Sequence, residues 1–135
     1  MSRHSALLAM AAVASLATAA VARAQETTLD VRATSAATVH ADAGTVVTSV
    51  FAVKNAASDT LRALPILTVP RGWSVVMGTA PVVLAPGAAD TWLVGVAVPA
   101  SAPAGGYVIR AALAARDTAR ADSIVVYVNE RRALQ

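Results

Sequence analysis

The stretch DTWLVGVAV (residues 90–98) decides the fold of this chain, because its side chains can be sorted by a period of two. Every second residue from Trp92 to Val98 is large and apolar, and the residues between them, Leu93 to Ala97, are apolar as well. Successive side chains of a strand point to opposite faces, so both faces of this segment are apolar. A strand with that pattern has little exposure, and the stretch therefore predicts a central strand of a β-sheet.

Short apolar segments of the same kind occupy the rest of the chain after residue 27, separated by turn residues. Residues 45–54 are apolar on both faces and predict a second central strand. Pro65 and Pro81 favour edge strands, because proline cannot donate a hydrogen bond to a neighbouring strand. Nine segments are candidates for strands, residues 38–40 being a weaker one, and we expect about seven strands from them. The segments are residues 28–32, 38–40, 45–54, 60–69, 73–77, 81–84, 90–98, 107–114 and 123–128.

The number and spacing of these segments predict an all-β fold, a two-sheet Greek-key sandwich, with a closed barrel as the alternative. Trp73 and Trp92 are expected to fill the space between the sheets, with Trp73, Val75 and Met77 on one side of their strand. Residues 111–121 are rich in alanine and suit a helix as well. The β-branched residues on either side of them favour a hairpin around residues 116–118 instead.

The amino terminus has the three parts of an export signal. Arg3 gives a positive start, residues 5–22 are uncharged and mostly apolar, and Ala22-Arg23-Ala24 places small residues where a signal peptidase cuts. We predict a cleavable helical signal peptide (residues 1–24), a sandwich domain (residues 25–129) and a tail (residues 130–135). A retained membrane anchor is the alternative, since these 18 uncharged residues are at the lower margin of a span.

Composition excludes several functional classes. The chain has 135 residues, 56% of them hydrophobic, a net charge of +3 and no cysteine, which fits one globular domain without disulfides or cysteine-bound metal. Signal cleavage would remove the positive charges of Arg3 and Arg23, and the remaining cations are scattered. We therefore expect no nucleic-acid partner, and no stable membrane span once the signal is removed. The expected location is extracytoplasmic, either periplasmic or secreted.

Three turn motifs occur in order: PRGWS (residues 70–74), VLAPG (residues 83–87) and VPASAPAGGY (residues 98–107), after a strand that ends in VKN (residues 53–55). This ordered set resembles the NEW3-type domain and the related CARDB-like modules of exported prokaryotic proteins. The resemblance covers about residues 45–128 and implies an immunoglobulin-like sandwich without catalytic machinery. It also implies structural roles for Asn55, Gly72, Trp73, Leu84, Pro86, Gly87, Pro99, Pro103, Gly105 and Tyr107.

Candidate chemistry is sparse. His40 is the one histidine that remains after cleavage, with Asp42 two residues away, but no serine lies in a nucleophile motif. Ser49 and Ser123 are the serines considered as its partners. We expect no catalytic residue, no cofactor and no metal. Calcium is the weak alternative, resting on aspartates at turns and strand ends: Asp42, Asp59, Asp90, Asp117 and Asp122.

Tyr127 is the best candidate for a side chain that faces a partner or a glycan, because it alternates with the apolar residues Val126 and Val128. The leading hypothesis is a non-enzymatic exported module for protein–protein contact or envelope assembly, with an envelope or extracellular protein as partner. The alternative is a carbohydrate-binding accessory domain that uses exposed aromatic rings. A small hydrolase that depends on His40 is the third hypothesis.

Overall fold

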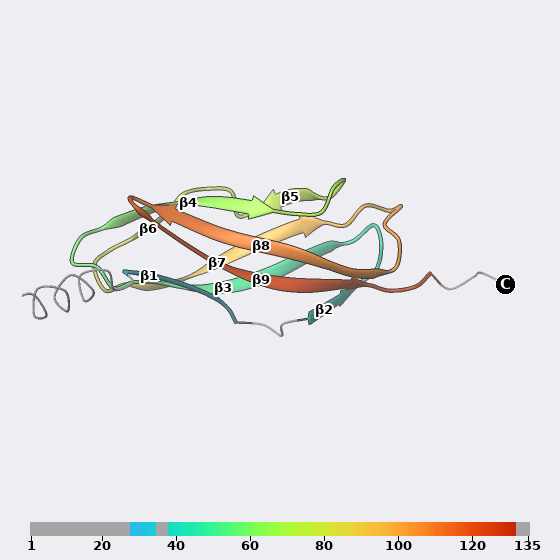
Figure 1. Ribbon diagram of the computed structural model, residues 1–135, viewed down its shortest axis with the longest axis horizontal. Helices are drawn as coiled ribbons and strands as arrows, with labels where there is room; N and C mark the ends of the chain where they lie inside the picture. Colours follow the sequence, from blue (N-terminus) through green and yellow to red (C-terminus); the bar gives the residue numbers. More distant parts are fainter. Residues whose placement is uncertain (1–27, 35–37, 132–135) are drawn as a thin grey trace, which may run out of the picture.

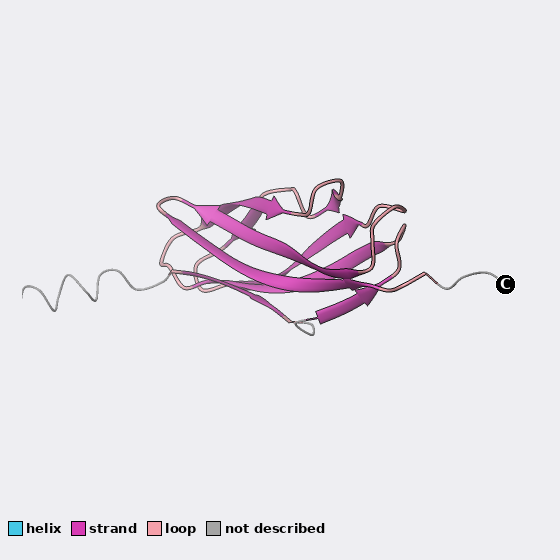
Figure 2. Cartoon of the chain, turned by 45° about the vertical axis from the view of Figure 1, so that its right-hand side comes forward, coloured by secondary structure: helices cyan, strands magenta, loops and turns pink. Residues whose placement is uncertain are grey.

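The computed structural model describes residues 28–34 and 38–131, which form strands and no helix (Figures 1 and 2). Nine strands are present, two more than the count of about seven, because both short segments near residues 40 and 83 pair with neighbours. The strands are β1 (Leu29–Ala33), β2 (Thr38–Ala41), β3 (Val46–Asn55), β4 (Leu61–Thr68), β5 (Ser74–Met77), β6 (Val82–Leu84), β7 (Ala89–Ala97), β8 (Gly105–Ala115) and β9 (Thr118–Val128).

The strands form two separate sheets, a four-stranded sheet in the order β1-β3-β7-β5 (sheet I) and a five-stranded sheet in the order β2-β9-β8-β4-β6 (sheet II). Successive strands from β1 to β8 alternate between the sheets, and only β8 and β9 are joined as a hairpin. In Figure 1 the long strands β8 and β9 cross in front of β3 and β7. The fold is therefore an immunoglobulin-like sandwich rather than the closed barrel.

The core lies between the sheets and is built from one face of each long strand. As predicted, the segments around residues 50 and 94 are the inner strands of sheet I, β3 and β7. Trp73 and Trp92 are 7% and 4% exposed, which confirms that both are core residues. Trp92 packs against Phe51 with 5.5 Å between ring centroids, and its indole nitrogen donates to the Gly78 carbonyl oxygen at 3.0 Å. A buried indole is stable because its N–H has this partner.

Pro65 lies on a locally open stretch of β4. Residues 61–63 of β4 pair with β6, whereas residues 64–68 pair only with β8. Pro65 therefore lies beyond the end of β6, on an edge as predicted, where a missing donor costs the sheet least. Pro81 directly precedes β6, which is the last strand of sheet II.

The alanine-rich segment forms the β8–β9 hairpin and not a helix. Both strands are longer than expected, since β9 starts at Thr118 and pairs with β8 along its whole length. Arg116 in the turn has a φ of 53°, a left-handed conformation that few non-glycine residues adopt. Pairing with neighbouring strands thus overrides the helix propensity of alanine in this segment.

The expectation that Met77 shares the inner face with Trp73 is wrong. The register between β5 and β7 shifts between Val75 and Met77, and this bulge turns the end of β5. Met77 is 41% exposed on the outer face of sheet I, next to Val76. A bulge inserts one residue into the alternation, so a strict period of two cannot predict the orientation of the residues after it.

The expected signal peptide (residues 1–24) lies outside the described residues, and so do the last four residues of the expected tail (residues 130–135). Within the described part of the chain, no helix has the length and apolar character needed to cross a membrane.

Candidate functional site

Asn55 joins two turns at one end of the sandwich. Its side-chain nitrogen donates to the carbonyl oxygens of Asp59 at 2.8 Å, Leu84 at 3.0 Å and Ala85 at 3.1 Å. Its side-chain oxygen accepts the backbone N–H of Ala57 at 2.9 Å. Asn55 is completely buried, so these bonds replace the water that the amide has lost. The side chain is a structural clamp between the turn after β3 and the turn after β6.

The Pro86-Gly87 turn leads from β6 into β7 beside this clamp. Gly87 has a φ of 72°, and the backbone N–H of Ala88 donates to the carbonyl oxygen of Ala85 at 3.0 Å. Leu84 is 2% exposed and packs in the core. The turn therefore reverses the chain at a point where a positive φ is required.

A second group of motif residues lies at the other end of the sandwich. Trp73 and Tyr107 pack with 4.9 Å between their ring centroids, and the Tyr107 hydroxyl donates to the Pro103 carbonyl oxygen at 2.7 Å. The N–H of Trp73 donates to the Pro70 carbonyl oxygen at 3.1 Å, which closes the turn containing Gly72, whose φ is 89°. These residues connect the turn after β4 with the segment that leads into β8.

Two further motif residues belong to this segment. Pro99 accepts the N–H of Ala102 at 3.0 Å, and Gly105 starts β8 with a φ of 144°. The motif residues thus form two groups of turn contacts in which the polar atoms bond to the protein itself. They account for the fold and provide no convergent groups for a ligand.

Tyr127 and His40 form an exposed aromatic pair on the outer side of sheet II. Tyr127 is 40% exposed, and its ring centroid lies 5.4 Å from that of His40, with the planes tilted by 55°. The two residues are directly paired between β9 and β2, and Gly106 pairs with Tyr127 on the other side. Because Gly106 has no side chain, one edge of the tyrosine ring is uncovered. The sequence singled out both residues but not their contact, which depends on the parallel β2–β9 pairing.

The structure does not bring His40 together with the serines considered as nucleophiles. Ser49 is 3% exposed on the inner side of β3, in the other sheet. Ser123 lies on β9, four residues before Tyr127, which is about 13 Å along a strand. Asp42 accepts a hydrogen bond from the side chain of Asn129 at 3.1 Å. Neither of these two serines therefore lies where His40 could activate it.

Four of the five aspartates at turns and strand ends, all but Asp117, bond to neighbouring groups. Asp90 accepts the N–H of Thr91, and Asp59 pairs with Arg116 at 3.3 Å. No cluster of three or more metal-ligating side chains occurs among residues 28–34 and 38–131.

Asp122 ties the two sheets together where the chain crosses between them. Its carboxylate accepts the backbone N–H of Ala33 on β1 at 2.7 Å and that of Ser123 at 2.8 Å. These two bonds, the one from Ala33 first, hold the pKa of the Asp122 carboxyl below its ordinary value of 3.8. Asp122 points inward from a part of β9 that does not pair with β2. Its bond to Ala33 therefore also brings β1 against an edge of β9 that has no neighbouring strand.

The feature that the sequence analysis missed is the outward side of sheet II, which we call the open face. It consists of the outward side chains of β2, β9, β8, β4 and β6, among which Tyr127 was the only one singled out as facing a partner. Cross-strand pairing places Val108 beside Val125, Ile66 beside Ala112 and Leu64 beside Ala114. The large hydrophobic residues exposed on it, from 62% to 37%, are Val83, Val108, Ile66, Leu64, Tyr127 and Val125.

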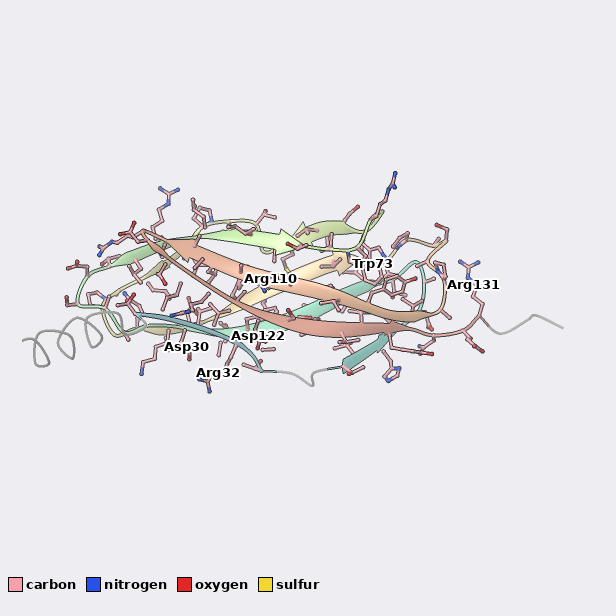
Figure 3. All side chains as sticks on the ribbon, viewed as in Figure 1. Asp30, Arg32, Trp73, Arg110, Asp122 and Arg131 are labelled. Atoms are coloured by element: carbon pink, nitrogen blue, oxygen red, sulfur yellow. The ribbon has the colours of Figure 1, made fainter. Side chains whose placement is uncertain are left out.

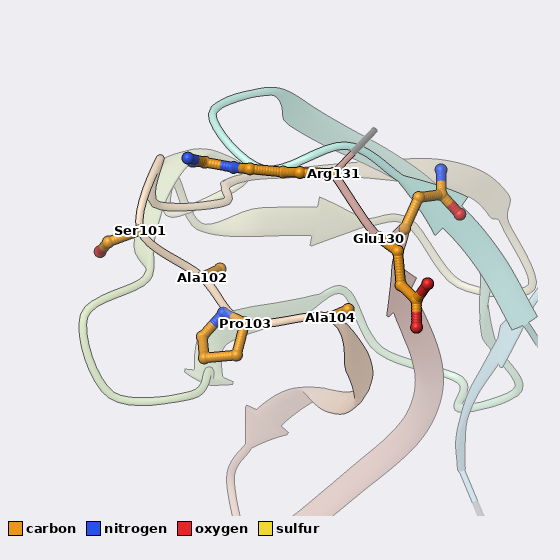
Figure 4. A pocket seen from close by; sticks show the side chains of 7 residues that line it. Ser101, Ala102, Pro103, Ala104, Glu130 and Arg131 are labelled. Carbon is orange, nitrogen blue, oxygen red and sulfur yellow. The ribbon is translucent and has the colours of Figure 1, made fainter. Parts of the chain in front are cut away.

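A shallow hollow lies at the end of the sandwich beside the carboxyl end of β9 (Figure 4). Residues 101–104 form one wall, and Asn129, Glu130 and Arg131 form the other. In Figure 4 the side chains of Glu130 and Arg131 extend in different directions and do not converge on one point. The hollow therefore lacks the convergent polar groups of a ligand pocket.

Solved structures resemble this chain in fold. A mutant of Salmonella alpha-2-macroglobulin matches with a TM-score of 0.58 and 18% identity, over 76% of this chain and 7% of that one. A family 123 glycoside hydrolase from Clostridium perfringens matches with a TM-score of 0.61 and 9% identity, over 78% of this chain and 28% of that one. A FixG-related protein from Vibrio parahaemolyticus matches with a TM-score of 0.58 and 11% identity, over 76% of this chain and 95% of that one.

The chain is thus comparable with a small part of the first two proteins and with nearly all of the third. No similar sequence was found among curated proteins. The sequence model described as "NPCBM-associated, NEW3 domain of alpha-galactosidase" matches residues 41–116, from the end of β2 to the β8–β9 turn. This range starts near the expected start at residue 45, and it ends before β9, whereas the resemblance in the turn motifs extends to about residue 128. It contains both groups of turn contacts described above, and the chain belongs to the NPCBM-associated NEW3 domain family.

Proposed function

We propose that this protein is a non-catalytic, exported module that acts by contact with another protein of the cell envelope or the extracellular space. The observation that carries the proposal is the open face, where apolar side chains of several strands lie together without a covering element in the described chain. Contiguous exposed apolar surface on a soluble domain is typical of an interaction site. The tripartite amino terminus of the sequence supports export.

The non-catalytic part of the proposal rests on the chemistry of the described residues. The polar side chains of the motif residues, such as those of Asn55 and Tyr107, form hydrogen bonds to backbone carbonyl oxygens in turns. His40 packs against a tyrosine ring rather than between a nucleophile and a carboxylate. A contact module requires a rigid surface and no reactive group. Such modules provide area and shape, and specificity follows from the few polar groups on the surface.

Chemical crosslinking in intact cells that make the tagged full chain tests this function. We expect one reproducible partner from the envelope or the medium, and a mature mass that corresponds to cleavage after Ala24. Repeated recovery of the protein as a monomer without a crosslinked partner would contradict the contact function. A mass that retains residues 1–24 would contradict the cleaved signal but not the contact function.

A carbohydrate-binding accessory role is the second candidate, favoured by the exposed pair of His40 and Tyr127. The burial of Trp73 and Trp92 removes them from this role, so Tyr127 must supply the stacking surface. Under this candidate a glycan array binds the wild-type protein and loses the signal in Tyr127→Ala. Val125→Ala, a neighbouring change that leaves both rings in place, is the matched control. An array on which the wild-type protein binds nothing eliminates the candidate.

A further inference from the structure

The open face carries charges of one sign only. Two arginines, Arg62 on β4 and Arg110 on β8, project from its strands, and no aspartate or glutamate occupies an outward position on β2, β9, β8, β4 or β6. Neither guanidinium has a hydrogen bond or an ion pair within the described residues. Figure 3 shows Arg110 near the middle of the long strand β8. The face thus has a free cation at its centre.

Of the carboxylates close in sequence to this face, Asp122 and Asp59 are engaged elsewhere, and Asp117 and Glu130 lie beyond the two ends of β9. Asp122 precedes the outward residue Ser123, but it points inward and accepts the N–H of Ala33. Asp59 pairs with Arg116 beyond the far end of the strands. Within residues 28–34 and 38–131 Arg110 therefore has no acidic cross-strand neighbour, since it pairs with Ser123 and Thr68.

Apolar rows lie on both sides of this cation. Toward one end, Val108 and Val125 are paired, followed by the row of Gly106, Tyr127 and His40. Toward the other end, the outward residues are alanines of β8 and β9, next to a leucine and an isoleucine of β4. That second group consists of Ala112, Ala114, Ala119, Ala121, Leu64 and Ile66. Ala112 is buried, and the small side chains of the other three alanines allow another surface to approach the backbone of this part of the sheet.

We propose that the open face binds a protein surface in which aliphatic side chains surround a carboxylate, and that this carboxylate pairs with Arg110. The proposal rests on the contact function above and adds the surface and the chemistry of the partner. Charge complementarity selects an acidic partner, because a lone guanidinium buried in an interface requires an anion. An arginine can hold a carboxylate with two parallel hydrogen bonds, which fixes the orientation of the partner as well.

The same charge pattern excludes a second copy of this chain packed face to face. Arg110 is at the middle of the face, so a twofold arrangement brings like charges together and offers no carboxylate in return. An anionic lipid surface is also disfavoured. Membrane binding of this kind uses clusters of four to eight cations, whereas the strands of this face provide two arginines.

A photocrosslinking amino acid placed at single positions of the full chain in intact cells tests the surface. Thr68 reports on the open face, and Thr48 on β3 is the matched position on the outer face of sheet I. We expect an adduct with one protein from Thr68 and none from Thr48. An adduct from Thr48 alone would overturn this inference and leave the contact function intact, and no adduct from either position would count against both.

Binding of the purified adduct partner then tests the charge. We expect Arg110→Glu to weaken binding roughly tenfold or more, whereas Lys54→Glu on sheet I should change it by less than about twofold. Both variants are compared with the wild type by thermal melting, so that a folding defect is separated from lost contact. Unchanged binding in Arg110→Glu would overturn the proposal. So would an adduct between two copies of this chain, or binding to anionic vesicles with the same loss in the variant.

Discussion

On the outer face of sheet I, Val76 and Met77 lie over the backbone of Gly95, and a Cβ atom added there would meet the Met77 Cβ at 3.1 Å. On the open face of sheet II, a Cβ atom on Gly106 would meet nothing closer than Val125 Cγ1 at 3.7 Å. Both glycines occupy outward positions in long strands, so the sequence pattern does not distinguish them. The difference shows that Val76 and Met77, at the bulged end of β5, cover the backbone at Gly95, whereas the backbone at Gly106 is open.

The charges of the two faces differ in the same way. On sheet I, Asp30 and Arg32 form an ion pair at 3.0 Å on the edge strand β1. On sheet II, Arg110 lies without an acid among apolar neighbours. On sheet I, Asp30 and Arg32 therefore satisfy each other and Lys54 stays unpaired among the described residues, whereas the outward arginines of sheet II have no outward acid on their own sheet.

Gly95→Ala should give the largest loss of stability on either outer face. The new methyl group would lie 3.1 Å from Met77 Cβ and 3.3 Å from Val76 Cγ2, tighter than ordinary contact, so the end of β5 has to give by a few tenths of an ångström. We expect the free energy of unfolding to fall by about 2 kcal/mol, measured by urea denaturation.

Gly106→Ala is the matched change on the open face, and it should raise the free energy of unfolding by about 0.5 kcal/mol. The added methyl group has ordinary contact distance to Val125, and alanine loses less backbone freedom on folding than glycine. Equal losses in the two alanine variants would show that both faces are packed alike, against the contrast drawn here.

Asp122→Asn tests the edge at which the two sheets meet. The amide can replace only one of the two accepting oxygens, so we expect a loss of about 1 kcal/mol near neutral pH. The native pKa of Asp122 lies below its ordinary value, so its contribution is present above 3.8 and is lost as the pH falls through the native pKa. The difference between wild type and variant should therefore shrink in acid.

Asp117→Asn, a change in the β8–β9 turn, is the control for that measurement and should alter stability by less than about 0.5 kcal/mol. A wild-type advantage over Asp122→Asn that stays constant down to the lowest pH at which the protein remains folded would contradict the role given to the Asp122 carboxylate.

Val108→Thr should have the smallest effect on the isolated protein, within about 0.5 kcal/mol, because Val108 is 58% exposed and the hydroxyl remains in water. The same change at Val94, which is 1% exposed, should cost about 2 kcal/mol because the hydroxyl is buried. Thermal melting of the two variants measures the contrast. A similar cost at both positions would mean that the open face is covered in the isolated protein.

Much of the fold could be predicted because a buried strand is recognisable from the pattern of apolar residues in its own sequence. The double-faced apolar pattern around Val50 and Val94 identified the two central strands of sheet I, and Pro65 marked an open stretch of β4. The outward orientation of Met77 could not be predicted because a bulge after Val75 interrupts the alternation of inward and outward side chains along β5. The open face escaped prediction because Ile66, Ala112 and Ala121 become neighbours only through the registers of β4, β8 and β9.

The sequence by itself determined which residues alternate, where turns require glycine or proline, and which buried side chains build the core, because these depend on covalent geometry and on separation from water. The tertiary structure alone decided which outward residues meet. Pairing partners and registers are set by contacts between strands far apart in the chain, and they placed Arg110 between apolar rows and His40 against Tyr127.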